Sequence, residues 1–140
     1  MSIRDPWSEL VSEEDVLDLH AEAIRLHGGD GSPPHAGCVD RSLGAAWTAE
    51  GYSETDNSKP GLCFAACLLF YLVKNHCFID GNKRAAWAAS MEALRSLGLT
   101  IKATDDEAED YCKSIIAHEV QRATDVISWF APRLEEYSDI

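Results

Sequence analysis

Positive charge is scarce in this sequence. Its 140 residues include 12 Lys and Arg against 24 Asp and Glu, which gives a formal net charge of −12 at pH 7. Most of such a surface would repel the phosphates of DNA or RNA, so we expect no direct nucleic-acid partner. A local cationic pocket and a basic protein partner are both compatible with this charge.

Long hydrophobic runs are also missing. The longest, residues 62–73, has 12 residues, whereas a helix needs about 20 to cross a bilayer. The N-terminus lacks the basic-then-apolar pattern of a secretion signal. We therefore expect a cytoplasmic protein without a membrane partner.

Paired cysteine motifs are absent as well. The five cysteines are Cys38, Cys63, Cys67, Cys77 and Cys112, and no C-x-x-C spacing occurs. Cys63 and Cys67 lie one helical turn apart in the apolar run. We expect all five to be reduced core residues, with a zinc site as the alternative.

The common catalytic fingerprints are not found. There is no Walker motif, nucleophile elbow or dinucleotide fingerprint, and His118 lacks the second histidine of metalloprotease spacing. The glycines of residues 28–31 follow no strand and precede no Gly-Lys-Ser/Thr. They predict a helix cap and a turn in place of a phosphate loop.

Helix signals are present along most of the chain. Ser12 caps a first helix that Gly28 ends, and Asp40 caps a short second helix. Thr104 and Glu107 form a capping box for a later helix. The faces that we expect to be buried comprise Val16, Leu19, Ala23, Ile24 and His27 in the first helix, and Ile127, Phe130, Ala131 and Leu134 in a last helix from about residue 124.

Two further helices are expected at the centre of the fold. Residues 62–73 have no polar face, so that helix must be surrounded. The helix from about residue 82 to 97 is rich in Ala and Ser, whose small side chains allow close helix approach. We expect these two helices to pack together, connected by residues 76–84.

The remaining segments complete an all-α prediction. Residues 1–11 form an N-terminal arm, and the polar residues 51–60 are placed to act as a flap. Residues 100–102 are briefly extended, and no strand alternation occurs elsewhere. The sequence predicts one domain, residues 1–140, with about six helices around the buried pair.

The connection between the central helices carries the chemistry. A helix that begins at Gly81 or Asn82 presents unpaired N–H groups and the positive end of its dipole, which together bind anions such as phosphate. Lys83 and Arg84 add full charges at the same end. Asn82 donates its amide to a phosphate or satisfies the turn.

Two further residues of this segment are candidates for catalysis. Asp80 is either the helix cap or the carboxylate beside a Mg²⁺ ion that bridges nucleotide phosphates. His76 is either structural or the base that takes a proton from an attacking hydroxyl. Phe78 anchors the segment in the core and so fixes His76. We assign no chemistry to Cys77.

Residues 76–84 resemble the signature of the Fic/Doc family, and the form Asp80-Gly81-Asn82-Lys83-Arg84 is similar to its death-on-curing (Doc) branch. The adenylylating Fic branch usually has glycine at the position of Lys83 and a second arginine at the position of Trp87. Residues 26–29, 40–46 and 94–98 also resemble Doc proteins. Cys77 departs from the pattern, in which proline is common. The inhibitory Ser/Thr-x-x-x-Glu-Gly/Asn segment is not found, because Ala46 precedes Glu50-Gly51.

The resemblance implies a toxin of a toxin–antitoxin pair. Doc proteins transfer the γ-phosphate of ATP to a threonine of elongation factor Tu, and the C-terminal segment of an antitoxin folds over the site. The implied catalytic residues are His76, Asp80 and Arg84, with Asp80 on the side of the Mg²⁺ ion. The implied nucleotide-binding residues are Gly81, Asn82, Lys83 and Arg84.

Three functions follow as hypotheses. The first is phosphate transfer to a Ser/Thr hydroxyl of a translation factor. The second is AMP transfer, as in the Fic branch, with the nucleotide lying the other way round. The third is an inactive Fic-like binding module. Lys83 and the missing second arginine favour the first, and the intact set of His76, Asp80, Asn82 and Arg84 disfavours the third.

Overall fold

Six α-helices and one small sheet make up the computed structural model, which describes residues 6–51 and 61–137. A short 3₁₀ helix, Pro6–Glu9, precedes the first α-helix. The elements in chain order are α1 (Glu13–His27), α2 (Cys38–Gly51), α3 (Leu62–Asn75), α4 (Asn82–Arg95), β1 (Leu99–Ile101), α5 (Asp105–Ile116), α6 (Asp125–Phe130), a second 3₁₀ helix (Ala131–Arg133) and β2 (Leu134–Glu136). The expected all-α class with about six helices is confirmed.

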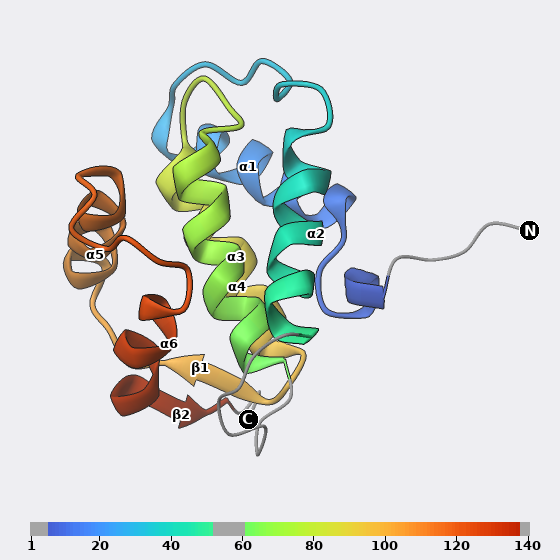
Figure 1. The fold of residues 1–140 in the computed structure, drawn as a ribbon. Coiled ribbons are helices and arrows are strands. Elements are labelled where there is room, and N and C mark those ends of the chain that lie inside the picture. The colour runs from blue at the N-terminus through green and yellow to red at the C-terminus, as the bar shows by residue number, and fades with distance from the viewer. Residues whose placement is uncertain (1–5, 52–60, 138–140) are drawn as a thin grey trace, which may run out of the picture.

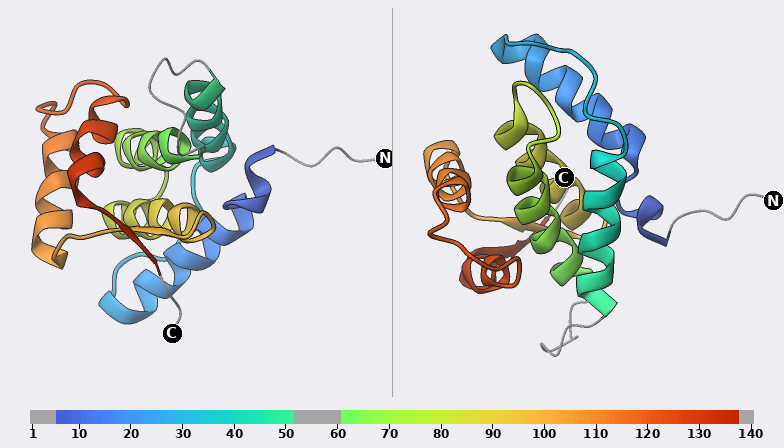
Figure 2. Two further views of the ribbon diagram at one scale, coloured as in Figure 1. Left: turned by 90° about the horizontal axis from the view of Figure 1, so that it is seen from below. Right: turned by 45° about the horizontal axis from the view of Figure 1, so that its top comes forward.

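The helices α3 and α4 lie side by side at the centre, with α1 and α2 on one side and α5 and α6 on the other (Figures 1 and 2). Ten residues of α3 are buried, which confirms that this helix is surrounded. The buried Ser90 Oγ of α4 donates a hydrogen bond to the Ala65 carbonyl of α3 at 2.7 Å. The small side chains of α4 therefore bring the two backbones close together, as expected.

The helix caps predicted at Ser12 and Thr104 are present, and both are capping boxes, of which only the one at Thr104 was expected. Ser12 and Asp15 cap α1, and Thr104 and Glu107 cap α5. The prediction for Asp40 is wrong, because α2 begins at Cys38 and has 14 residues. Asp40 therefore lies in the first turn and does not cap the helix.

The buried faces of two helices differ from the expectation. In α1 the buried residues are Val16 and His20, while His27 is exposed. In α6 they are Val126 and Phe130. Expected core residue Leu134 lies beyond α6, in strand β2.

A two-stranded antiparallel sheet replaces the short extended segment that the sequence predicts. Leu99 pairs with Glu136 and Ile101 with Leu134. Each strand has three residues, so neither shows enough alternation to be recognised alone. This sheet joins the segment after α4 to the end of the described chain.

Two predictions concern segments that are only partly described. Of the N-terminal arm, residues 1–5 lie outside the described residues, while Trp7 is half-buried and packs against the core. The proposed flap, residues 51–60, also lies outside them apart from the backbone of Gly51. No helix among residues 6–51 and 61–137 is long and apolar enough to span a membrane.

Candidate active site

The connection between α3 and α4 alternates between buried and exposed residues. Cys77 and Phe78 are 1% and 2% exposed, which confirms Phe78 as an anchor in the core. His76, Ile79 and Asp80 are exposed. Phe78 thus fixes the loop in the core, while the polar side chains of His76 and Asp80 face solvent.

His76 is the C-cap of α3 and has a left-handed backbone, with φ 49° and ψ 55°. A non-glycine residue rarely adopts this conformation, which the surrounding structure must hold in place. The left-handed cap ends α3 and turns the chain toward α4. The imidazole therefore stands at the junction of the two central helices.

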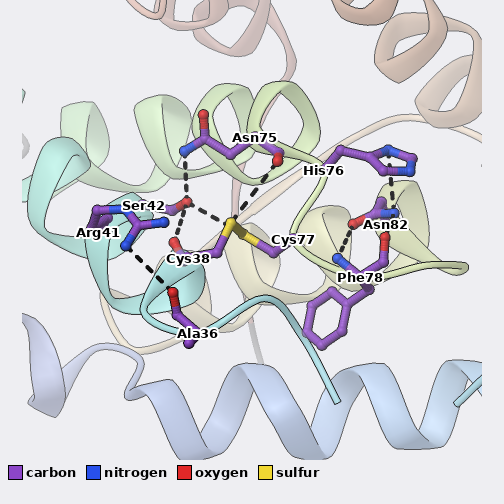
Figure 3. The surroundings of a disulfide bond; sticks show 9 residues. All are labelled: Ala36, Cys38, Arg41, Ser42, Asn75, His76, Cys77, Phe78 and Asn82. Atoms are coloured by element: carbon purple, nitrogen blue, oxygen red, sulfur yellow. Dashed lines mark hydrogen bonds between the residues drawn. A yellow bond between two sulfur atoms is a disulfide. The ribbon is translucent and has the colours of Figure 1, made fainter. Parts of the chain in front are cut away.

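Asn82 holds the loop closed (Figure 3). Its Oδ1 accepts the Phe78 N–H at 2.9 Å, and its Nδ2 donates to the Phe78 carbonyl at 2.7 Å. The same Nδ2 lies 3.3 Å from His76 Nδ1. Asn82 is 8% exposed, and these contacts are those of a turn-forming residue. Its role toward a phosphate stays a prediction.

The contact between Asn82 and His76 also bears on the imidazole tautomer. An amide NH₂ group only donates, so Nδ1 accepts and the hydrogen of the neutral ring is on Nε2. A general base needs a lone pair on the nitrogen that faces the substrate. For His76 to accept a proton at Nε2, this contact must therefore open and the hydrogen must move to Nδ1.

Helix α1 and the loop after it position Asp80. The Asp30 N–H donates to Asp80 Oδ2 at 2.8 Å, and a Cβ built at Gly29 would lie 3.2 Å from the Asp80 Cβ. Of the two alternatives for Asp80, the helix-cap role is wrong, because Gly81 is the N-cap of α4 and no side-chain hydrogen bond caps it. The carboxylate is instead fixed by the turn of residues 28–31.

His20, to which no role is assigned from the sequence, supports the same loop from the protein interior. Its Nε2 donates to the Asp80 carbonyl at 2.8 Å, and its ring stacks on Phe78 with the centroids 3.7 Å apart. The side chain is 4% exposed. Because C=O and N–H point in opposite directions across a trans peptide, this bond turns the Gly81 N–H away from His20. The spacing of four residues between Val16 and His20 was the sequence signal for this buried face.

The start of α4 has the features of an anion site. Gly81 has φ 79°, a conformation that favours glycine, and the first N–H groups of the helix have no side-chain cap. Lys83 is half-buried and Arg84 is exposed. Among the described residues neither of them forms a salt bridge. Their charges thus remain available to a ligand.

All six residues predicted for the site line one cleft of about 760 Å³, which is within the usual range for ligand pockets. They are His76, Asp80, Gly81, Asn82, Lys83 and Arg84. The remaining walls come from α1 and α5. The structure thus brings the predicted residues together, while their individual roles stay predictions.

The opposite walls of the cleft differ in character from the anion site. Asp105, Asp106 and Glu109 of α5 form an acidic side. Leu26, Ile79 and Ile116 are 60%, 52% and 48% exposed and give the cleft an apolar rim. Cys112 also lines it, and burial raises the pKa of its thiol to about 12 despite the nearby Lys83. This thiol is therefore uncharged at neutral pH.

The profile of the Fic/DOC family matches residues 10–94, more than half of the chain. The chain belongs to the Fic/DOC family. It is also 43% identical over 53 residues to Toxin Doc of Mycolicibacterium smegmatis. That match covers 36% of this chain and only 41% of the toxin, so the chain aligns with less than half of its relative. No solved structure gives a significant match.

Two positions at which the chain departs from Fic patterns are now located. Trp87, at the position of the second Fic arginine, is half-buried on the cleft wall and packs edge-to-face against Trp129 and Phe130. Glu50, the residue nearest in sequence to the inhibitory motif, accepts the N–H groups of Gly61 and Phe64. It therefore caps the far end of α3, about 20 Å from His76 for a helix of this length.

The expectation of five reduced cysteines is wrong for two of them. Cys38 and Cys77 form a disulfide, while the buried Cys63, Cys67 and Cys112 are not disulfide-bonded. The two paired residues lie 39 positions apart. No local spacing rule detects such a pair, because only the fold brings the start of α2 against the loop after α3.

Proposed function

We propose that this chain is a Doc-type toxin that transfers the γ-phosphate of ATP to a Ser/Thr hydroxyl of a translation factor. The observation that supports this most directly is one cleft that contains an exposed imidazole, a helix N-terminus without a side-chain cap and two cations that form no salt bridge within residues 6–51 and 61–137. By its resemblance to Doc proteins, the factor is elongation factor Tu. The toxin acts in the cytoplasm, where protein synthesis takes place.

The proposed roles follow the geometry of the cleft. The Gly81 and Asn82 end of α4 receives the phosphate oxygens, with Lys83 and Arg84 beside them. His76 takes the proton as the hydroxyl oxygen of the target bonds to the γ-phosphorus. The bond from that phosphorus to the bridging oxygen breaks, and ADP leaves with its electron pair.

Asp80 suits a magnesium ion that arrives with the nucleotide. Within residues 6–51 and 61–137 no group of three or more His, Cys, Asp and Glu side chains is placed to hold a metal by itself. Mg²⁺ needs only one or two carboxylates when phosphates supply the other oxygens. The ion would neutralise phosphate charge, and Asp80, held by the Asp30 N–H, would contribute one carboxylate.

An antitoxin is the proposed regulatory partner. The rim residues Leu26, Ile79 and Ile116 offer an apolar surface over the cleft, on which a C-terminal antitoxin segment would fold. The net charge of −12 favours a segment with basic residues.

AMP transfer is the second candidate, because the same anion site accepts a nucleotide in the reverse direction. Trp87 argues against it, since an apolar ring stands where a second phosphate-binding arginine is expected. An inactive binding module is the third candidate.

The three are separated by incubating the protein with elongation factor Tu and ATP labelled on the α or the γ phosphate. Label carried over from γ alone supports phosphate transfer. Label from α alone establishes AMP transfer, and no transfer from either contradicts an active enzyme on this target.

His76→Ala is the matching variant. We expect a loss of transfer of at least about 100-fold, because the proton acceptor is removed, and an unchanged circular dichroism spectrum. His118→Ala, outside the cleft, is the control and should transfer normally. Full transfer by His76→Ala would refute the role of this histidine.

A further inference from the structure

The Cys38–Cys77 disulfide is adjacent to the proposed base. Cys38 is the first residue of α2, and Cys77 directly follows His76. Their Cα atoms are 5.5 Å apart, and the bond crosses from α2 to the loop that contains the imidazole (Figure 3). The disulfide therefore ties the backbone next to His76 to a different element.

Hydrogen bonds add two more ties between the same segments. The His35 N–H, just before α2, donates to the Cys77 carbonyl at 2.9 Å. On the other side of His76, Asn75 Nδ2 donates to Ser42 Oγ at 2.9 Å, and Ser42 belongs to the first turns of α2. Both neighbours of His76 are thus held by the start of α2.

His76 itself has few means of fixing its own position. Its side chain is exposed, and its side-chain hydrogen bond is the long contact of 3.3 Å with Asn82. Its left-handed backbone is unfavourable for a residue with a Cβ. The position of the imidazole therefore depends on the ties at residues 75 and 77, of which the disulfide is the covalent one.

The remaining cysteines provide a contrast. Cys63 and Cys67 have their sulfur atoms 3.8 Å apart within α3 and form no disulfide. They lie in the first two turns of α3, toward the end opposite to His76. The pair that bonds is the one that reaches the site. In a cytoplasmic protein such a bond is typically transient and redox-responsive.

We propose that Cys38 and Cys77 form a thiol–disulfide site that sets the position of His76 and so controls transfer. This inference rests on the proposed function. In the oxidised form the loop holds His76 over the anion site. Reduction removes the covalent tie between Cys77 and α2 and leaves only the hydrogen bonds, so the backbone at His76 leaves its left-handed conformation more readily and transfer slows.

The exchange is with a dithiol reductant. One thiolate of the reductant attacks a sulfur of the pair, the Cys38–Cys77 bond breaks, and a mixed disulfide forms. The second thiol of the reductant then attacks the mixed disulfide, releases the protein thiol and closes a cyclic disulfide within the reductant. Two electrons and two protons pass to the protein, which then has two thiols, while the reductant becomes a cyclic disulfide.

Access to the sulfur atoms requires a local opening. Cys38 and Cys77 are 6% and 1% exposed; Cys38 directly follows the surface loop of residues 28–37, and the Cys77 carbonyl accepts a hydrogen bond from His35 of that loop. Surface loops open at low free energy, whereas the core does so only on global unfolding. We therefore expect the pair to react slowly but in the folded state, and before the core cysteines.

The test compares wild type with Cys38→Ala, each air-oxidised and each treated with dithiothreitol. Non-reducing peptide mass spectrometry reports the bond, and the thermal unfolding curve reports that the reduced protein is still folded. Transfer of γ-phosphate is measured in all four samples. We expect a fall in wild-type kcat of roughly 10-fold to 100-fold on reduction, with the ATP KM little changed. Cys38→Ala should resemble the reduced protein in both conditions.

A second readout keeps this result separate from the proposed function. The NMR signal of the His76 ring Cε1–H, assigned with His76→Ala, should shift and broaden on reduction of wild type and stay unchanged in Cys38→Ala. If no sample transfers phosphate, the proposed function fails, and this signal alone decides whether the pair positions His76. Free thiols at 38 and 77 in the air-oxidised protein would overturn the inference. So would equal kcat and an unmoved His76 signal after reduction.

Discussion

At the residue scale, the site depends on groups that hold other groups in place. Asn82 closes the loop around Phe78, and His20 holds the Asp80 carbonyl from within the core. Asn82 is a candidate site residue from the sequence alone, whereas His20 is not. Substitutions at two residues separate this kind of support from direct participation in binding.

The first concerns His20, for which two substitutions divide its two contacts. His20→Phe keeps a ring against Phe78 and loses the donor to the Asp80 carbonyl, whereas His20→Gln keeps a donor and loses the stacking. We expect His20→Phe to lower kcat/KM about 10-fold, since the Gly81 amide loses its fixed orientation. His20→Gln should restore part of it, although its stability is lower.

Steady-state kinetics with ATP and thermal unfolding of both variants make the comparison. Activity that follows stability in both would show that His20 is only a core residue.

The second concerns Arg84, whose guanidinium faces the cleft without a salt bridge among the described residues. Arg84→Ala should weaken ATP binding by roughly 10-fold, or about 1.4 kcal/mol, because a charge-assisted contact to phosphate is lost. Titration calorimetry measures this. Arg95→Ala, at the other end of α4, is the control, and equal affinities for the two variants would contradict the phosphate role.

At the element scale, one helix is held at both ends by side chains from elsewhere. The α3 N-terminus is capped by the Glu50 carboxylate of α2, and its C-terminus is tied through Asn75 to Ser42 of the same helix. The position of α3 against α2 is thus set by polar contacts at its two ends and by apolar packing between them. The loop that begins at His76 inherits this position.

Glu50→Ala should destabilise the fold by about 1–2 kcal/mol, since two N–H groups at the α3 N-terminus lose their acceptor. Transfer by the folded variant should be normal, because Glu50 lies at the far end of α3. Urea unfolding gives the stability, and kinetics at a temperature below the transition give the activity. A variant with raised activity would mean that Glu50 restrains the site, which its contacts do not suggest.

Much of this level could be predicted from the sequence, because the signals are local. Each of these signals lies within the helix that it predicts: the Ser12 and Thr104 caps, the apolar run of α3 and the small residues of α4. Predictions were wrong where a residue distant in sequence determines the contact. Asp80 is fixed by Asp30 and not by its own helix.

For the same reason, the disulfide and the two-stranded sheet were not predicted. Cys77 looked inert because its partner Cys38 is 39 positions away. Strand β1 was detected only as a short extended segment because its partner, β2, follows α6.

At the scale of the whole molecule, the chain is organised around one core. The buried side chains of α1 to α6 form a single cluster, and β2 at the end of the described chain returns to pair with β1. Within residues 6–51 and 61–137, no second cluster of buried residues forms a separate core. We therefore expect the protein to unfold as one unit.

Differential scanning calorimetry of the oxidised protein should show one transition whose calorimetric and van't Hoff enthalpies agree. For about 140 residues the enthalpy at the midpoint should be roughly 100 kcal/mol. Two resolved transitions would show that the chain consists of more than one domain. The Cys38→Ala variant should show the same single transition at a lower temperature, because its unfolded chain is less constrained.

The resting contact between Asn82 and His76 has a consequence for an idle enzyme. An imidazole whose Nδ1 accepts from the Asn82 amide carries its hydrogen on Nε2, which then has no lone pair with which to deprotonate a water molecule. Under the proposed function, this arrangement would suppress wasteful hydrolysis of ATP until a protein acceptor enters and disturbs that contact. The same amide that shapes the loop would thus spare the nucleotide supply of the cell while no target is bound.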